Sequence, residues 1–150
     1  MFNTFTDSQD SKAYTPVEVF NVQLGRRYRF RIASNGLFNC PIQFSIDSHN
    51  LTVIASDGAP FEPIEVESVN VFPGERFDII VHTDQSIGNY WMRTRGEADC
   101  SVKKAKQVAI VRYEGASDTN PSEPITYSDG YRSGKVRVSF SNVTRFVFTL

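Results

Sequence analysis

Apolar and polar positions alternate through the stretch from Val22 to Arg95, and this pattern predicts β-strands. At its centre, Phe44 and Ile46 are expected on one side of a strand, with the polar residues between and after them on the other. Side chains two residues apart share one face of a pleated strand, so the period of two favours a sheet over a helix. A short polar turn follows, and a second strand is expected to end at Asp57-Gly58.

The same alternation recurs on both sides of this central stretch. It slips between Val66 and Val69, which predicts two short strand pieces or a bulge. Seven or eight short strands with frequent turn signals predict an antiparallel β-sandwich or barrel with Greek-key connections. The further strands are expected at residues 17–22, 27–33, 62–71, 77–83, 90–95 and 108–113.

The length of 150 residues fits one domain with looser ends. Residues 1–13 are polar and are expected to be disordered or a loop end, and residues 14–116 carry the strand pattern. Turn-forming residues then indicate that 117–150 is a linker with an irregular tail. Within that tail, residues 135–150 are able to pair as a hairpin, which the sequence does not place in the sandwich.

Composition excludes several classes of function. Hydrophobic residues make up 40 % and aromatic residues 13 % of the chain, which is enough for a core. The formal net charge of −1, without long runs of like charge, argues against binding nucleic acid or a membrane surface electrostatically. No apolar run approaches the roughly 20 residues of a membrane span. The first residues lack the basic and apolar regions of a signal peptide.

Residues that could carry metal or nucleophilic chemistry are sparse. His49 and His82 lie on different predicted strands, without a His-x-His or His-Cys-His motif. A copper or zinc site needs three or four converging ligands. The two histidines and two cysteines are enough in number for one mixed site, but no motif supports it. Structural roles are favoured for both histidines. The sequence also lacks a Gly-x-Ser-x-Gly nucleophile motif, and its carboxylates show no marked acid–base pair.

Other noticeable side chains have simple structural explanations. Arg27, Arg29 and Arg31 share one face of a predicted strand, which fits either an anion site or, more simply, a solvated face. Trp91 is expected in the core rather than on a ligand platform. A salt-bridged corner at Glu75-Arg76 is expected to fix the entry of the next strand.

The cysteines and sequons bear on the cellular compartment. Cys40 and Cys100 would form one disulfide in an extracellular protein and two buried thiols in a cytosolic one. Asn50 and Asn142 each begin an Asn-x-Thr glycosylation sequon. Sequons are common by chance, so they favour secretion only slightly.

Five ordered motifs lie at residues 25–32, 45–58, 63–68, 74–78 and 89–93. In this order they resemble the second plastocyanin-like domain of laccase-type multicopper oxidases, and residues 39–43 and 104–116 look most like arthropod laccases. The likeness covers residues 14 to about 130 and fails after Val136.

The resemblance implies a cupredoxin β-sandwich, truncated at its N-terminal strand ahead of Ala13, from a secreted extracellular oxidase. Such enzymes oxidise diphenols at a type 1 copper and reduce dioxygen to water at a trinuclear cluster. The first and third domains hold the copper, so this chain is expected to bind no metal, to carry no catalytic residue and to be inactive alone. Its expected partners are those two domains and a phenolic substrate.

The resemblance also implies two site assignments. Fungal laccases place an acid in the loop before Ser-Ile-Asp-x-His that accepts the phenol proton, and counting back from Ser45 puts Asn39 at that position. An amide is no base, but it is able to hydrogen-bond a phenol. Cys40 and Cys100 are predicted to form an intradomain disulfide. The alternatives are a non-enzymatic β-sandwich binding or adhesion module and a stand-alone cupredoxin.

Overall fold

The computed structural model describes residues 2–6, 12–35, 40–98 and 106–124, and these ranges contain strands but no helix. The strands are β1 (Phe2–Thr6), β2 (Lys12–Pro16), β3 (Val19–Val22), β4 (Arg27–Ala33), β5 (Ile42–Ile46), β6 (Leu51–Ser56), β7 (Ala59–Val66), β8 (Val69–Val71), β9 (Arg76–His82), β10 (Asn89–Gly96) and β11 (Lys106–Tyr113).

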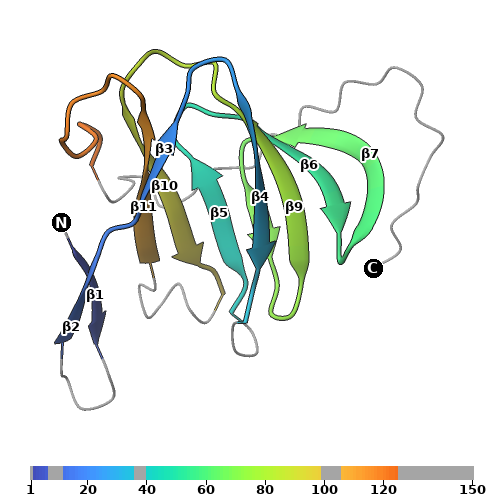
Figure 1. Ribbon diagram of the computed structural model, residues 1–150. Helices are drawn as coiled ribbons and strands as arrows, with labels where there is room; N and C mark the ends of the chain where they lie inside the picture. The colour runs from blue at the N-terminus through green and yellow to red at the C-terminus, as the bar shows by residue number, and fades with distance from the viewer. Residues whose placement is uncertain (1, 7–11, 36–39, 99–105, 125–150) are drawn as a thin grey trace.

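Two sheets pack face to face (Figure 1). One has five strands in the order β3-β11-β10-β5-β8, and the other has four in the order β4-β9-β6-β7. The pairs within both sheets are antiparallel except β3 with β11, which run parallel. This arrangement confirms the predicted all-β, cupredoxin-like sandwich.

The core lies between the two sheets and takes side chains from both. The predicted alternation of β4 is confirmed: Tyr28, Phe30 and Ile32 pack against the core, while the three arginines between them are exposed. One of them, Arg29, forms an ion pair with Asp78 on β9, so this face is a solvated strand face. The buried core members are Val22, Phe44, Ile46, Leu51, Val53, Val66, Val69, Val71, Ile79, Val81, Met92, Val111 and Tyr113.

Strand β5 departs from the simple alternation expected of it. Its polar residue Ser45 is buried, as is Asp47 directly after the strand, although the pattern placed both on the opposite side from the core residues. Strand β5 lies between β10 and β8, and its burial pattern shows that side chains on both of its faces are covered.

The break in the apolar–polar alternation between Val66 and Val69 marks the point at which the chain changes sheet. Val66 ends β7 in the four-stranded sheet, and Val69 begins β8 in the five-stranded sheet. The prediction of two short strand pieces is confirmed, because the chain crosses from one layer to the other at this point. Apolar side chains on each side of the crossing are buried, as the core of a sandwich requires.

Asp57 and Gly58 close the β6–β7 hairpin. Their φ angles are +50° and +86°, so both residues adopt the left-handed conformation of a two-residue turn that suits the twist of a hairpin. Arg76 reinforces this end: its backbone N–H donates to Asp57 Oδ1 at 3.0 Å, and its guanidinium forms an ion pair with the same carboxylate. Arg76 is thus bridged to Asp57, while the carboxylate of Glu75 accepts the N–H of Phe72.

The two ends of the chain differ from the expectations for them. Within residues 1–13, expected as a loop end, the structure places β1 and the start of β2, which pair as a hairpin beside the sandwich (Figure 1). At the other end, residues 117–124 return to the five-stranded sheet: the indole N–H of Trp91 donates to the carbonyl of Glu123 at 2.8 Å. The expected hairpin at 135–150 lies outside the described residues.

Candidate functional site around His49 and Tyr113

A tight turn after β5 points the ring of His49 into the protein. The backbone N–H of Asp47 donates to the carbonyl of Trp91 at 2.9 Å, which ties the end of β5 to β10. Ser48 then adopts a left-handed conformation with a φ of +63°, and the N–H of His49 returns to the carbonyl of Ile46 at 3.2 Å. The turn buries the imidazole, and only 3 % of His49 is exposed.

Both ring nitrogens of His49 have partners. Nδ1 lies 2.7 Å from the carbonyl oxygen of Asp47, and Nε2 lies 2.6 Å from the hydroxyl oxygen of Tyr113. A carbonyl only accepts hydrogen bonds, so Nδ1 carries the proton. In the neutral imidazole Nε2 is then an acceptor, and the Tyr113 hydroxyl donates to it.

Burial keeps both partners of this hydrogen bond uncharged. Burial lowers the pKa of His49 below its usual value of 6.5. The hydrogen bond to the Asp47 backbone and the attraction of the Asp84 and Asp47 carboxylates raise the pKa, but burial has the larger effect. Burial also raises the pKa of Tyr113 to about 12. Loss of water around a charged form is costly, and this cost explains both directions. At neutral pH the pair is therefore a phenol hydrogen-bonded to a neutral imidazole.

Tyr90 completes an aromatic cluster with this pair. Its ring centroid lies 5.0 Å from that of His49 and 5.5 Å from that of Tyr113, in edge-to-face arrangements. The Tyr90 hydroxyl donates to the carbonyl of Ser86 at 2.7 Å. Tyr90 is half-buried whereas Tyr113 is fully buried, so the cluster extends from the core toward the surface.

A buried ion pair lies next to the same turn. Arg93 on β10 binds both carboxylate oxygens of Asp47, at 2.8 Å from Nε to Oδ1 and 2.5 Å from Nη2 to Oδ2. The two side chains are 5 % and 8 % exposed. The planar guanidinium matches the carboxylate in geometry, which lets both charges remain inside the sandwich.

These residues were only partly predictable. A structural role was expected for His49, with a hydrogen bond from its ring to the backbone, and the contact with the Asp47 carbonyl agrees with it. Tyr113 and Arg93 were missed, because they are 64 and 46 residues away from their partners in sequence. Tyr113 follows the alternation of the apolar residues in its strand, which predicts that it is buried. The alternation does not identify its hydrogen-bond partner.

Of the predicted site residues, the structure describes Cys40 and Asn50. Asn39, Cys100 and Asn142 lie outside the described residues. Cys40 is disulfide-bonded. Its pairing with Cys100 stays a prediction. Asn50 is exposed, and its side-chain amide donates to Glu65 Oε1 at 2.6 Å.

The donor set of the described residues does not fit a copper centre. Both nitrogens of His49 are committed to hydrogen bonds, and His82 is exposed on β9, where its Nδ1 lies 3.7 Å from Asp84 Oδ2. Through the described ranges, no three side chains among His, Cys, Asp and Glu converge as metal ligands. Trp91 is in the core as expected, with 1 % of its surface exposed.

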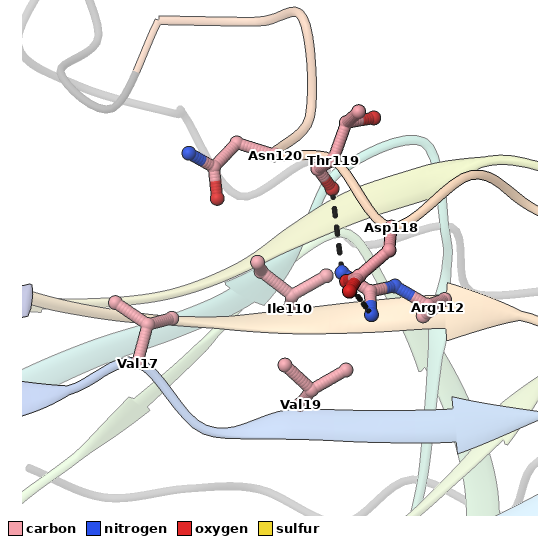
Figure 2. A pocket seen from close by; sticks show the side chains of 7 residues that line it. All are labelled: Val17, Val19, Ile110, Arg112, Asp118, Thr119 and Asn120. Atoms are coloured by element: carbon pink, nitrogen blue, oxygen red, sulfur yellow. Dashed lines mark hydrogen bonds and ion pairs between the residues drawn. The ribbon is translucent and has the colours of Figure 1, made fainter. Parts of the chain in front are cut away.

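A separate open pocket of about 510 Å³ lies at β3 and β11, beneath residues 118–120 (Figure 2). Val17, Val19 and Ile110 form its apolar floor. Arg112 at its rim pairs with Asp118 at 2.5 Å and also donates to Asn89 Oδ1 at 3.0 Å, so its charge is compensated. Arg112 is therefore one of the residues that hold residues 117–124 against the sheet, together with Trp91.

Among the residues that the structure describes, no helix is long and apolar enough to cross a membrane. The ranges with described secondary structure are built of strands and turns.

Comparisons with known proteins agree with this fold. The sequence profile of the multicopper oxidase family matches residues 2–116. Laccase-2 of Agaricus bisporus is 36 % identical over 115 residues, which are 72 % of this chain and 22 % of that protein. Laccase-5 of Trametes villosa is 38 % identical over 126 residues, which are 81 % of this chain and 23 % of that protein. The chain thus spans less than a quarter of the length of these curated relatives.

Solved structures show the same likeness. The laccase of Botrytis aclada superposes with a TM-score of 0.64 at 28 % identity, over 84 % of this chain and 23 % of that protein. The blue copper oxidase of Nitrosomonas europaea shares the fold, with a TM-score of 0.55 at 20 % identity over 69 % of this chain and 35 % of that one. The laccases named here are fungal, whereas the motifs suggested an arthropod type. The chain belongs to the multicopper oxidase family and forms a cupredoxin-like domain of it.

Proposed function

We propose that this chain is the second cupredoxin domain of a laccase-like multicopper oxidase, which oxidises diphenols and reduces dioxygen to water. In this proposal the domain is a scaffold and one wall of the substrate pocket. The first and third domains of the parent protein hold the copper that supplies the electron-transfer chemistry. The parent protein is extracellular, and its arthropod affinity stays a prediction.

The observation that carries this proposal is that both ring nitrogens of His49 already have hydrogen-bond partners inside the fold. His49 lies in the Ser45–Gly58 motif, the longest stretch shared with the family's second domain. The motif therefore serves packing and not metal binding. The relatives are laccases several times longer than this chain, which leaves room for copper-binding domains elsewhere. Family membership also disfavours the adhesion module.

Copper titration of the purified chain tests the assignment. We expect no blue absorption band, because the described donors do not converge; a strong band would overturn the proposal in favour of a stand-alone cupredoxin. The sequence of the parent protein gives a second test. His-x-His before this segment and His-Cys-His after it are expected, and their absence on both sides contradicts a laccase-like parent.

We extend the proposal to Asn39 as a hydrogen-bonding group for the phenol in the substrate pocket. Steady-state kinetics of Asn39→Ala in the parent enzyme, with a diphenol substrate, are expected to show a raised KM. The exposed Asn70 of β8 provides a matched control, since Asn70→Ala removes the same amide from another site. Unchanged KM and kcat in Asn39→Ala remove Asn39 from the pocket.

A further inference from the structure

We propose that Tyr113 and His49 form an internal redox site, in which Tyr113 gives up one electron while its hydroxyl proton passes to Nε2 of His49. The oxidant is a high-potential one-electron acceptor of the metal-complex class. The inference goes beyond the scaffold role, because both residues of the redox pair belong to this domain.

The hydrogen bond between these two residues provides the geometry. The hydroxyl oxygen of Tyr113 lies 2.6 Å from Nε2 of His49, and both side chains are buried. Because Nδ1 carries the proton and donates to the Asp47 carbonyl, Nε2 has a free lone pair directed at the phenol. A proton acceptor is thus in place before the electron leaves.

The step balances as a coupled transfer. The O–H bond of Tyr113 breaks and an N–H bond forms at Nε2 of His49, while the oxidant gains one electron. The products are a neutral phenoxyl radical and an imidazolium. When the reduced acceptor gives its electron back to the radical, Nε2 of His49 returns the proton and the phenol is restored. The carboxylates of Asp47 and Asp84 are the charged groups whose fields favour the imidazolium.

Tyr90 differs from Tyr113 in the hydrogen-bond partner of its hydroxyl, and this difference favours oxidation of Tyr113. The Tyr90 hydroxyl donates to the carbonyl of Ser86, which is not a base that can accept the proton. Oxidation of Tyr90 would therefore have to release its proton to water. The ring centroids of half-buried Tyr90 and buried Tyr113 are 5.5 Å apart, so Tyr90 provides an aromatic path for the electron from the buried pair toward the surface.

Flash photolysis of the full chain with a photo-oxidised ruthenium tris-bipyridine complex tests the proposal, with the tyrosyl radical followed by absorbance and electron paramagnetic resonance. The wild type is expected to give a long-lived radical that Tyr113→Phe abolishes. Tyr28→Phe is the matched control, since the Tyr28 hydroxyl accepts the N–H of Gln23 and has no imidazole partner. It is expected to retain the signal.

Two further measurements test the role of His49. His49→Gln replaces the base by an amide, and the radical is expected to form at least roughly 100-fold more slowly, the lower end of the typical contribution of a positioned base. Wild-type protein in D₂O, which needs no variant, is expected to form the radical more slowly than in H₂O. A long-lived radical that persists in Tyr113→Phe, or equal rates in D₂O and H₂O, overturns the proposal.

Discussion

Arg93 and Asp47 form a two-point ion pair inside the sandwich, with the guanidinium facing both carboxylate oxygens. Asp47 belongs to the turn that positions His49, and Arg93 belongs to β10, so the pair joins the turn to the middle of the five-stranded sheet. Removal of one member of such a pair leaves an uncompensated charge in a poorly solvated place.

Arg93→Met is therefore expected to lower the free energy of unfolding by about 3–5 kcal/mol, because the buried Asp47 carboxylate loses both of its hydrogen bonds to the guanidinium. Urea unfolding followed by tryptophan fluorescence measures the change. Arg29→Met is the matched control: the Arg29 side chain is 48 % exposed beside Asp78, and its loss is expected to cost about 0–1 kcal/mol. Equal losses in the two variants contradict a special role for the buried pair.

The buried histidine predicts a dependence of stability on pH. His49 has a lowered pKa in the folded protein, so below its usual value of 6.5 the unfolded chain binds a proton that the folded chain resists. The free energy of unfolding is then expected to fall as the pH drops from 6.5 through the folded pKa, by at most about 1.4 kcal/mol per pH unit. Above pH 6.5 this contribution is constant.

Urea unfolding between neutral pH and about pH 5 measures this slope, above the range in which carboxylates titrate. His49→Gln is expected to remove the slope, whereas His82→Gln leaves it, because His82 is exposed on β9. A slope unchanged in His49→Gln assigns the effect to another group.

The returning segment predicts a difference between two truncations. A chain ending at Ala116 loses the Asp118 partner of Arg112 and the Glu123 carbonyl that accepts the Trp91 indole N–H. A hydrogen bond contributes about 0.5–1.5 kcal/mol net, and the short chain is expected to lose at least this much. A chain ending at Pro124 keeps both contacts and is the control. Equal unfolding midpoints for the two truncated chains show that the segment does not stabilise the sheet.

The predicted disulfide between Cys40 and Cys100 gives a fourth test. In the chain-entropy description, closing a loop of about 60 residues contributes roughly 4 kcal/mol. Replacing both cysteines by serine is expected to lower the free energy of unfolding by about 2–5 kcal/mol. Mass spectrometry of secreted protein is expected to find no free thiol, and two free thiols refute the pairing.

Local patterns predicted the parts of this fold in which one face of a strand is solvated. Strand β4 follows directly from its alternation, and so does the break between two strand pieces after Val66, because period and phase are local properties of a strand. That the break is a change of sheet was not predicted. Strand β1 was missed, because its sequence Phe-Asn-Thr-Phe-Thr shows no clear period of two.

The candidate site was harder to predict because long-range contacts define it. The sequence around Asp47 does not show that Arg93 is its ion-pair partner. The sequence around His49 does not show that Tyr113 forms a hydrogen bond with Nε2. Strand order decides these contacts: β10 lies between β11 and β5, and it brings the three segments together. Residue types alone carry no information on this order.

The parallel pairing of β3 with β11 has a consequence for synthesis of the protein. Val19 on β3 pairs with Ile110 on β11, so the edge of the five-stranded sheet is completed by residues from opposite ends of the domain. A ribosome must release almost the whole domain before this pairing forms, and such distant contacts slow folding. Until then β3 exposes an unpaired edge, which makes the nascent chain a natural client for chaperones in the compartment where it folds.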